Sequence, residues 1–253
     1  MSSVASELPE TPPRPGLGAA FSAPLRIFVS PGKVAREIKS GLPWWPGLLL
    51  MILVGLCLAG LLLPLQQQLM AADISGGVGN TRGLELGEGG ELPAAARYGL
   101  LGGAIGGPLL GVPLMLLFVA FFYWLALTIT FGGAPFGRLF TLTVYTGFVG
   151  LAYQLLNALY LRFGGVELTS MKDLQSEALM LSLGALTSGE GFLHNFLAQL
   201  GVFQVWELVV FVVGAALLMG RARRSVAVPV VVVFLMGIAL AAFLATLGSR
   251  FGG

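Results

Sequence analysis

Charged side chains are scarce in this sequence. Its 253 residues include only 14 basic and 12 acidic ones, so charged residues make up 10% of the chain and hydrophobic residues 56%; an average soluble domain carries about 25% charged residues. A water-facing surface cannot be built from this composition, which excludes a soluble globular enzyme, a nucleic-acid-binding protein and a disordered protein. The formal net charge of +2 gives no reason to expect a polyanionic partner. The composition predicts an all-α integral membrane protein.

Cysteine and histidine, which build disulfides, metal sites and many catalytic sites, are almost absent. Cys57 is the single cysteine and lies in an apolar stretch, so the chain has no disulfide framework and no thiol pair. His194 is the single histidine, and no cysteine or carboxylate accompanies it at the spacing of metal ligands. No serine lies in a Gly-x-Ser-x-Gly motif. We therefore expect no catalytic residues, no metal and no cofactor, and we expect that the protein is not an enzyme.

Long apolar runs dominate the sequence instead. Five segments are long enough to cross a bilayer core of about 30 Å at a helical rise of about 1.5 Å per residue. The predicted spans cover residues 44–65, 109–130, 139–161, 202–219 and 229–247. Glu207 is the one charged residue that lies within them. The sequence thus predicts a bundle of five transmembrane helices.

The distribution of basic residues predicts how this bundle is oriented. Nine lysines and arginines lie before the first span and in the second and fourth connections, and five lie on the other side. The fourth connection alone carries Arg221, Arg223 and Arg224. Basic residues favour the cytoplasmic side, so we expect a cytoplasmic amino terminus and a carboxy terminus outside. The expected location is the plasma membrane, which is the inner membrane in a bacterium.

The segment before the first span divides into two parts. Residues 1–20 are expected to form a disordered cytoplasmic tail, residues 21–43 a juxtamembrane amphipathic segment, and residues 44–250 the membrane domain. A short helix is expected to begin at Ser30 and Pro31. Its basic residues are Lys33, Arg36 and Lys39. Such a helix is typical of the lipid headgroup layer, where it anchors the topology; a docking site for a cytoplasmic partner is the alternative.

A second amphipathic pattern lies in the connection before the fourth span, on the predicted outer side. Ser170 and Asp173 have the spacing of a capping box, and apolar residues then recur every three or four positions. These are Met171, Leu174, Ala178, Leu181 and Ala185. The pattern predicts an outer interfacial helix that packs on the bundle, with a lid or a partner groove as the alternative. The glycine-rich first outer connection, residues 66–97, is instead expected to be a mobile linker.

Small residues recur at four-residue steps in several spans. They are Gly99, Gly103, Gly107 and Gly111 before and within the second span, Gly237, Ala241 and Ala245 in the fifth, and Gly55 and Ala59 in the first. Such rows let helix backbones approach closely, and close van der Waals contact drives helix association in lipid. We expect tight packing inside the bundle, with a second copy or a partner helix as the alternative. Pro108 and Pro113 predict a kink or a broken helix in the second span.

Polar side chains occur at a matching depth in the third and fourth spans. They are Gln154, Asn157, Gln204 and Glu207. An ionisable residue inside a span is a functional candidate by default, although Glu207 lies only five residues inside the end of its span. We interpret the cluster as a set of polar contacts that hold the two helices together, with a site for an ion, a proton or a lipid headgroup as the alternative.

Two stretches of the sequence resemble the Yip1 family of five-span membrane proteins. The first contains residues 27–31 (IFVSP) and 42–46 (LPWWP), and the second contains residues 131–133 (FGG) followed by Tyr145. A proline that often follows this tyrosine in the family is missing here. The resemblance implies a five-helix bundle with a cytoplasmic amino terminus and no catalytic activity. Eukaryotic relatives are linked to membrane trafficking and small GTPases, and some bacterial ones to ABC-type exporters and the envelope.

We therefore expect a non-catalytic membrane subunit that scaffolds or supports a larger assembly, such as a transporter or an envelope complex. The alternative is a small transporter or channel component that moves an ion, a lipid or a small solute past the polar cluster. The expected partners are membrane lipids and either a membrane protein or a second copy of the chain. No nucleic acid is expected.

Overall fold

The computed structural model describes residues 15–77, 84–87, 89–171, 173–176, 181–187 and 191–251. The elements in chain order are α1 (Leu17–Val29), α2 (Pro31–Lys39), α3 (Trp45–Gly76), α4 (Ala94–Gly106), the π-helical η2 (Gly107–Gly111), α5 (Val112–Phe131), α6 (Phe136–Phe163), α7 (Asp173–Ser176), the 3-10 helix η3 (Leu183–Leu186), α8 (Phe192–Ala198), α9 (Val202–Met219) and α10 (Arg223–Phe251). The described residues form no strand, although one isolated bridge joins Ser182 to Gly201. The prediction of an all-α protein is confirmed.

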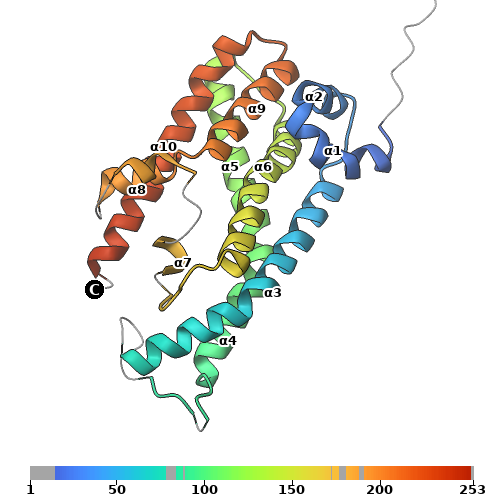
Figure 1. Ribbon diagram of the computed structural model, residues 1–253. Coiled ribbons are helices and arrows are strands. Elements are labelled where there is room, and N and C mark those ends of the chain that lie inside the picture. Colours follow the sequence, from blue (N-terminus) through green and yellow to red (C-terminus); the bar gives the residue numbers. More distant parts are fainter. Residues whose placement is uncertain are drawn as a thin grey trace, which may run out of the picture.

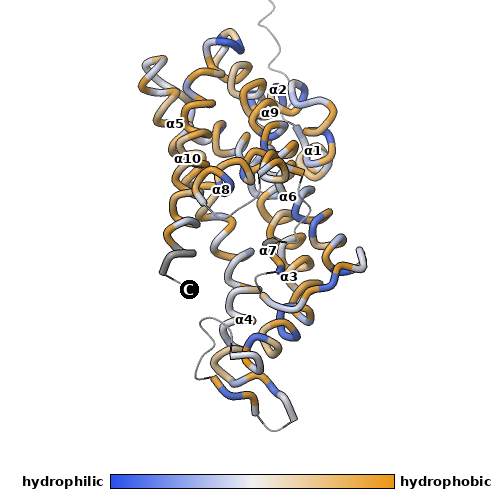
Figure 2. The backbone as a smooth tube through the Cα atoms, turned by 60° about the vertical axis from the view of Figure 1, so that its left-hand side comes forward, coloured by the Kyte–Doolittle hydropathy of each residue, from blue (hydrophilic) through white to orange (hydrophobic). Residues whose placement is uncertain are grey.

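Among the described residues, five helical segments are long and apolar enough to cross a membrane, as predicted. They are Trp45–Gly76, Ala94–Phe131, Phe136–Phe163, Val202–Met219 and Arg223–Leu247, the second of which combines α4, η2 and α5. Figure 1 shows an elongated bundle of helices, and in Figure 2 hydrophobic residues follow one another along most of its length. The chain is thus a multi-pass membrane protein with the predicted number of spans in the part that is described.

Helix α6 lies at the centre of this bundle. It packs against α3, α5 and α9, and also against α1 and α2. Half of its most apolar 18-residue window is buried inside the protein, against 11% to 33% in the other four spanning segments. Its buried residues Leu139, Leu142, Tyr145 and Val149 recur at three- and four-residue steps and therefore share one face of the helix. The other helices are positioned largely through their contacts with α6.

The helix boundaries differ from the apolar runs at several ends. The predicted fourth span coincides with α9. The first span, however, continues as α3 beyond the predicted end at residue 65, because residues 66–72 are glutamine, leucine, methionine and alanine, which are all good helix formers. It ends at Gly76 and is followed by Gly77, which adopts a left-handed conformation with φ of 62°. The first part of the connection predicted as a mobile linker is therefore helical, and the second spanning segment begins early, at Ala94.

The second spanning segment contains a π-helical turn where the sequence predicts a kink. Pro108 lies in the first turn of η2. Proline has no N–H to donate and interrupts the regular helical hydrogen bonds, and π turns occur as single-turn irregularities within longer helices. Pro108 also packs on α3 at Gly55, where an added Cβ atom would lie 3.1 Å from the Cβ atom of Pro108. Gly55 thus permits the close approach of α3 and η2, as the presence of a small residue predicts.

Helix α1 is not predicted by the sequence. It begins at Leu17, so the prediction of a disordered tail through residue 20 is wrong from that point; residues 1–14 lie outside the described part. Ala20, Ala23 and Ile27 are fully buried, and the helix packs against α3 and α6. Tertiary contacts of this kind stabilise a helix whose local sequence gives only a weak signal.

Helix α2 is the juxtamembrane helix that the sequence predicts, but protein covers its apolar face. Proline stands at the first position of the helix as expected. Val34 and Ile38 are at most 2% exposed, and α2 packs on α9 and α6. The exposed apolar residues of this region lie on α1 instead, at four-residue steps: Leu17, Phe21, Leu25 and Val29. The prediction that the apolar face of α2 contacts the lipid headgroup layer is therefore wrong.

The continuous outer helix predicted between residues 170 and 185 is not formed. α7 is a single turn, Ser182 is extended with φ of −135° and ψ of 165°, and residues 172 and 177–180 lie outside the described part. The predicted capping box does make its contact, because the N–H of Ser170 donates to the Asp173 carboxylate at 2.9 Å. Further along, Gly184 packs on α8, where an added Cβ atom would lie 2.7 Å from the Cα atom of Ala198. Contacts with α8 thus replace the continuation of the helix.

Candidate functional site

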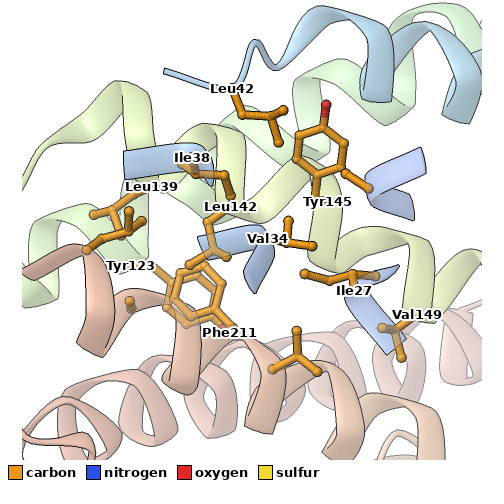
Figure 3. Close-up of a cluster of buried hydrophobic side chains, with 14 of the residues drawn as sticks. Ile27, Val34, Ile38, Leu42, Tyr123, Leu139, Leu142, Tyr145, Val149 and Phe211 are labelled. Atoms are coloured by element: carbon orange, nitrogen blue, oxygen red, sulfur yellow. The ribbon is translucent and has the colours of Figure 1, made fainter. Parts of the chain in front are cut away.

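The two stretches that carry the family resemblance meet in a buried core at one end of the bundle. This α1–α2–α6 core consists of Ile27, Val34, Ile38, Leu42, Leu139, Leu142 and Tyr145. Each of these side chains is at most 3% exposed, and Figure 3 shows them gathered from α1, α2, the linker to α3 and α6. Full burial of a large apolar side chain contributes about 1.5–3 kcal/mol. The core therefore fixes the amino-terminal helices firmly on α6.

Tyr145 joins this core to the beginning of α3. Its ring is fully buried, and its hydroxyl donates a hydrogen bond of 2.8 Å to the carbonyl oxygen of Pro43. Gly47 leaves room for the ring, since an added Cβ atom there would lie 2.9 Å from Cε1 of Tyr145. Beside it, the rings of Trp44 and Phe140 meet edge to face with their centroids 5.5 Å apart. Residues from both resemblance stretches thus hold the elbow between α2 and α3.

An ion pair joins α1 to α2. The guanidinium of Arg26 donates through both terminal nitrogens to the Glu37 carboxylate, and the Nη2–Oε2 distance is 2.8 Å. Nη2 also donates to the carbonyl oxygen of Ala19 at 2.7 Å. The hydrogen bond with Glu37 raises the pKa of Arg26 above its ordinary value. Both side chains remain about a fifth to a quarter exposed, so this pair fixes geometry more than it adds stability.

The turn between α5 and α6 is shaped by glycine and tryptophan. Gly132 follows α5 with φ of 79°, a conformation that glycine adopts without strain. The indole N–H of Trp124 donates to the carbonyl oxygen of Ala134 at 3.0 Å. The guanidinium carbon of Arg221 lies 5.6 Å from the ring centroid of Phe131. The turn between α9 and α10 therefore reaches the end of α5.

An open depression of about 630 Å³ separates the α2–α3 elbow from the start of α6. We call it the α2–α6 depression. Its lining residues are Ile38, Lys39, Ser40, Gly41, Leu42 and Trp44 on one side and Pro135, Phe136, Gly137, Arg138 and Thr141 on the other. Basic, hydroxyl and apolar groups therefore meet in one concave surface.

The predicted basic residues lie at this end of the molecule. Lys33, Arg36, Lys39, Arg221, Arg223 and Arg224 are all exposed. Helix α2, the start of α6 and the turn between α9 and α10 bring them together, as the arrangement in Figure 1 shows. The segments predicted as cytoplasmic thus share one end of the bundle.

The structure does not assemble the predicted polar cluster around Glu207. A Cβ atom added at Gly150 would lie 3.1 Å from a carboxylate oxygen of Glu207, and this carboxylate makes no hydrogen bond to any described residue. Gln204 folds back over the start of its own helix. Gln154 is exposed, and Asn157 is half-buried. Glu207 thus rests against the backbone of α6 rather than against the predicted amides.

The predicted small-residue faces are exposed, and Gly99 and Gly103 line an open cavity of about 320 Å³ between α3 and α4. All seven residues of these faces are exposed: Gly99, Gly103, Gly107, Gly111, Gly237, Ala241 and Ala245. An added Cβ atom at Gly99, Gly103, Gly107 or Gly237 would meet no atom of the described chain within 4 Å. Tight packing inside the bundle through these rows is therefore wrong for the described residues. Contact with another chain remains a prediction.

The close helix contacts use glycines that sequence reasoning missed. A Cβ atom at Gly214 would lie 2.5 Å from Leu142, one at Gly47 2.9 Å from Tyr145, and one at Gly147 3.1 Å from Met51. None of these glycines belongs to a row at four-residue steps, so the spacing rule gave no signal for them. For the contact at Gly47, the sequence offers one indication, which is the Leu-Pro-Trp-Trp-Pro segment that precedes this glycine.

The comparisons with known proteins agree with this geometry. Neither a curated protein nor a solved structure matches the chain. The Yip1 domain profile, however, matches residues 25–244, a range that begins in α1, includes both resemblance stretches and ends in α10. The match covers most of the 253 residues and all of the α1–α2–α6 core. The chain belongs to the Yip1 family.

Proposed function

We propose that the protein is a non-catalytic subunit that supports a larger membrane assembly, such as a transporter or an envelope complex. The observation that carries this proposal is that the small residues on α4, η2 and α10 are exposed and that added Cβ atoms at Gly99, Gly103, Gly107 and Gly237 would meet no atom of the described chain within 4 Å. In lipid, helices associate through close van der Waals contact at small residues. A row of glycines that packs on nothing within its own chain is a surface on which another helix can lie.

The first such surface is on α4, where Gly99 and Gly103 are separated by one turn. Their neighbours Tyr98 and Ile105 are 73% and 54% exposed, and at about 100° per residue both lie on one side of the glycine strip. The second surface is on α10, where Met236 and Leu240 lie on one side of Gly237 and are more than half exposed. A strip of small residues beside larger ones allows a partner helix to approach closely.

The alternative, a small transporter or channel component, has less support. Its pathway would pass Glu207, whose carboxylate lies against the backbone of α6 at Gly150. A partly buried carboxylate near one end of a span can reach the membrane surface by extending its side chain. The position of Glu207 in its span therefore does not require that the residue take part in transport.

A gentle-detergent purification tests the supporting role. The wild-type chain should retain partner proteins at fixed stoichiometry, and Gly103→Ile should release them because it places a bulky side chain on the exposed small-residue strip of α4. Gly60→Ile is the matched control, since Gly60 is also exposed in a span with nothing within 4 Å of an added Cβ atom. A wild-type chain that purifies alone, with a water-accessible path to Glu207, would overturn the proposal in favour of the transporter.

We also propose that the basic end of the bundle faces the cytoplasm of a bacterial cell. The support is that the exposed basic residues of α2 and of the turn before α10 share one end, and such residues are retained on the cytoplasmic side. Alkaline phosphatase fused after residue 253 should be active, and the same enzyme fused between residues 220 and 223 should be inactive. The reverse pattern would contradict this orientation.

A further inference from the structure

The α2–α6 depression has a position that suits a bound small molecule or headgroup. Its volume is about 630 Å³, and it is open to the surrounding surface rather than enclosed. One wall belongs to the elbow before α3 and the other to the start of α6, and both α3 and α6 are membrane-spanning segments. The depression therefore lies where two spans leave the membrane.

The charge of the depression is positive and uncompensated. Lys39 and Arg138 lie on opposite walls, are exposed, and form no ion pair with any described residue. No acidic residue lines the depression. The nearest acidic residue in sequence, Glu37, is already bound by Arg26. Two cations that face one cavity without a carboxylate favour an anionic ligand.

The backbone at the start of α6 adds to this positive charge. Pro135 precedes the helix and supplies no side-chain cap, and the N–H groups of Phe136 and Gly137 donate to no described acceptor. The first N–H groups of a helix have no partner within the helix and carry its positive dipole end. Phe136 and Gly137 line the same depression as the two cations, so the positive end of this helix lies beside them and supports the selection of an anion.

The remaining lining is apolar and aromatic. Ile38 and Leu42 form part of the floor, and the rings of Trp44 and Phe136 stand at the two sides. Trp44 is 44% exposed at the beginning of α3, which is the position of an interfacial aromatic residue. A ligand that combines a charged head with a hydrocarbon chain satisfies both parts of this lining. A free inorganic anion would leave the apolar part unused.

We infer that the α2–α6 depression binds the phosphate group of an anionic phospholipid, with Lys39 and Arg138 as the charged contacts. The headgroup lies in the depression, and the acyl chains follow the apolar surface past Trp44 into the membrane. The site does not depend on a protein partner, so it stands or falls separately from the supporting role proposed above. It differs from a diffuse basic surface in requiring two particular residues.

Native mass spectrometry of the full-length protein tests the site. The protein is purified in a zwitterionic detergent and titrated with phosphatidylglycerol or with phosphatidylcholine of identical acyl chains. We expect one phosphatidylglycerol to be retained in preference to phosphatidylcholine. The Lys39→Gln/Arg138→Gln double variant should bind phosphatidylglycerol roughly 30-fold more weakly, because each basic residue near anionic lipid contributes about fivefold.

The matched control is Arg223→Gln/Arg224→Gln, which removes the same charge from exposed residues outside the depression. It should leave the affinity unchanged within about twofold. Equal losses in the two double variants would show that binding follows overall charge, and would overturn the site. Equal retention of the two lipids by the wild type would overturn it without any variant, so the result does not depend on the folding of the mutants.

A separate arm distinguishes a lipid from a free phosphate. Glycerol 1-phosphate and inorganic phosphate are added at millimolar concentration to the lipid-free protein, and the thermal stability is measured. The lipid site predicts little stabilisation by either, and clear stabilisation by phosphatidylglycerol. Stabilisation by the free phosphates equal to that by the lipid would contradict the lipid assignment and indicate a soluble phosphate ligand.

Discussion

An alanine at position 214 would place a methyl group between α6 and α9 where no space exists. Gly214 is buried on α9, and an added Cβ atom would lie 2.5 Å from Cδ1 and 2.9 Å from Cδ2 of Leu142. Carbon atoms pack best at about 3.5–4.0 Å, so either the helices or Leu142 must move by roughly 1 Å. Leu142 is fully buried in the α1–α2–α6 core, so its side chain has no free volume to enter.

The expected loss of stability follows from two opposing effects. Inserting a methyl group into a packed core costs about 1–3 kcal/mol, and replacing glycine by alanine in a helix returns up to about 1 kcal/mol. We therefore expect Gly214→Ala to lower the free energy of unfolding by about 1–2 kcal/mol. The measurement is reversible unfolding by sodium dodecyl sulfate in mixed micelles, followed by circular dichroism.

Two further variants show whether the reasoning is correct. Gly237→Ala changes the same residue type on α10, where nothing lies within 4 Å of an added Cβ atom, and it should leave stability unchanged or raise it. Leu142→Ala removes both atoms that the new methyl group would strike, so in this background Gly214→Ala should cost less than about 0.5 kcal/mol. Equal effects at positions 214 and 237, or additive losses in the double variant, would refute the argument.

Three other variants probe single contacts. Tyr145→Phe leaves the Pro43 carbonyl without its buried donor and should lower the free energy of unfolding by about 1–3 kcal/mol in the same assay. Glu207→Gln removes a partly buried charge that no described residue neutralises, so stability should be unchanged or higher; a clear loss would show that the carboxylate itself stabilises the bundle. Hydrogen bonds from Thr169 and Ser170 lower the pKa of Asp173, so its contribution is present at neutral pH and is lost as the pH falls below about 4. Protection of the Thr169 amide from hydrogen exchange should therefore exceed that in Asp173→Asn at pH 7, and the difference should disappear in acid.

The spanning segments could be predicted because lipid imposes a simple rule. A helix that crosses the membrane must be apolar for about 20 residues, and the run that forms α9 has the predicted ends. The ends of α3 and of the second segment were less predictable. There the helix continues past the apolar run, because backbone hydrogen bonding and helix propensity operate beyond the membrane as well as within it.

The contacts inside the bundle could not be predicted in the same way. A soluble helix shows its buried face as an apolar stripe, but a span such as α5 is apolar on all sides, so its pattern does not separate protein contacts from lipid contacts. For this reason the spacing of the rows at Gly99 and Gly237 predicts interior contacts, although both residues are exposed. The isolated glycines at positions 47 and 214, which touch Tyr145 and Leu142, gave no such pattern.

The predicted outer helix failed for a related reason. Met171, Leu174 and Leu181 have helical spacing, but Ser182 pairs with Gly201 at the start of α9 and Gly184 packs on α8. These contacts join residues that lie 19 and 14 positions apart in sequence, and a local pattern carries no information about them. The capping contact of Asp173, which depends on residues three and four positions away, was the part that could be predicted.

The π-helical turn at Gly107–Gly111 alters the geometry of the glycine row that crosses it. A π turn contains one residue more than an α turn, and one residue corresponds to a rotation of about 100° about the helix axis. The exposed glycines of α4 and the residues of α5 below them therefore do not continue along a single straight line. A straight helix packed on Gly99 and Gly103 would lose contact with this segment at η2. It could follow only α4, whose 13 residues span about 20 Å at the rise of an α-helix. Any helix that follows the whole segment must bend around it.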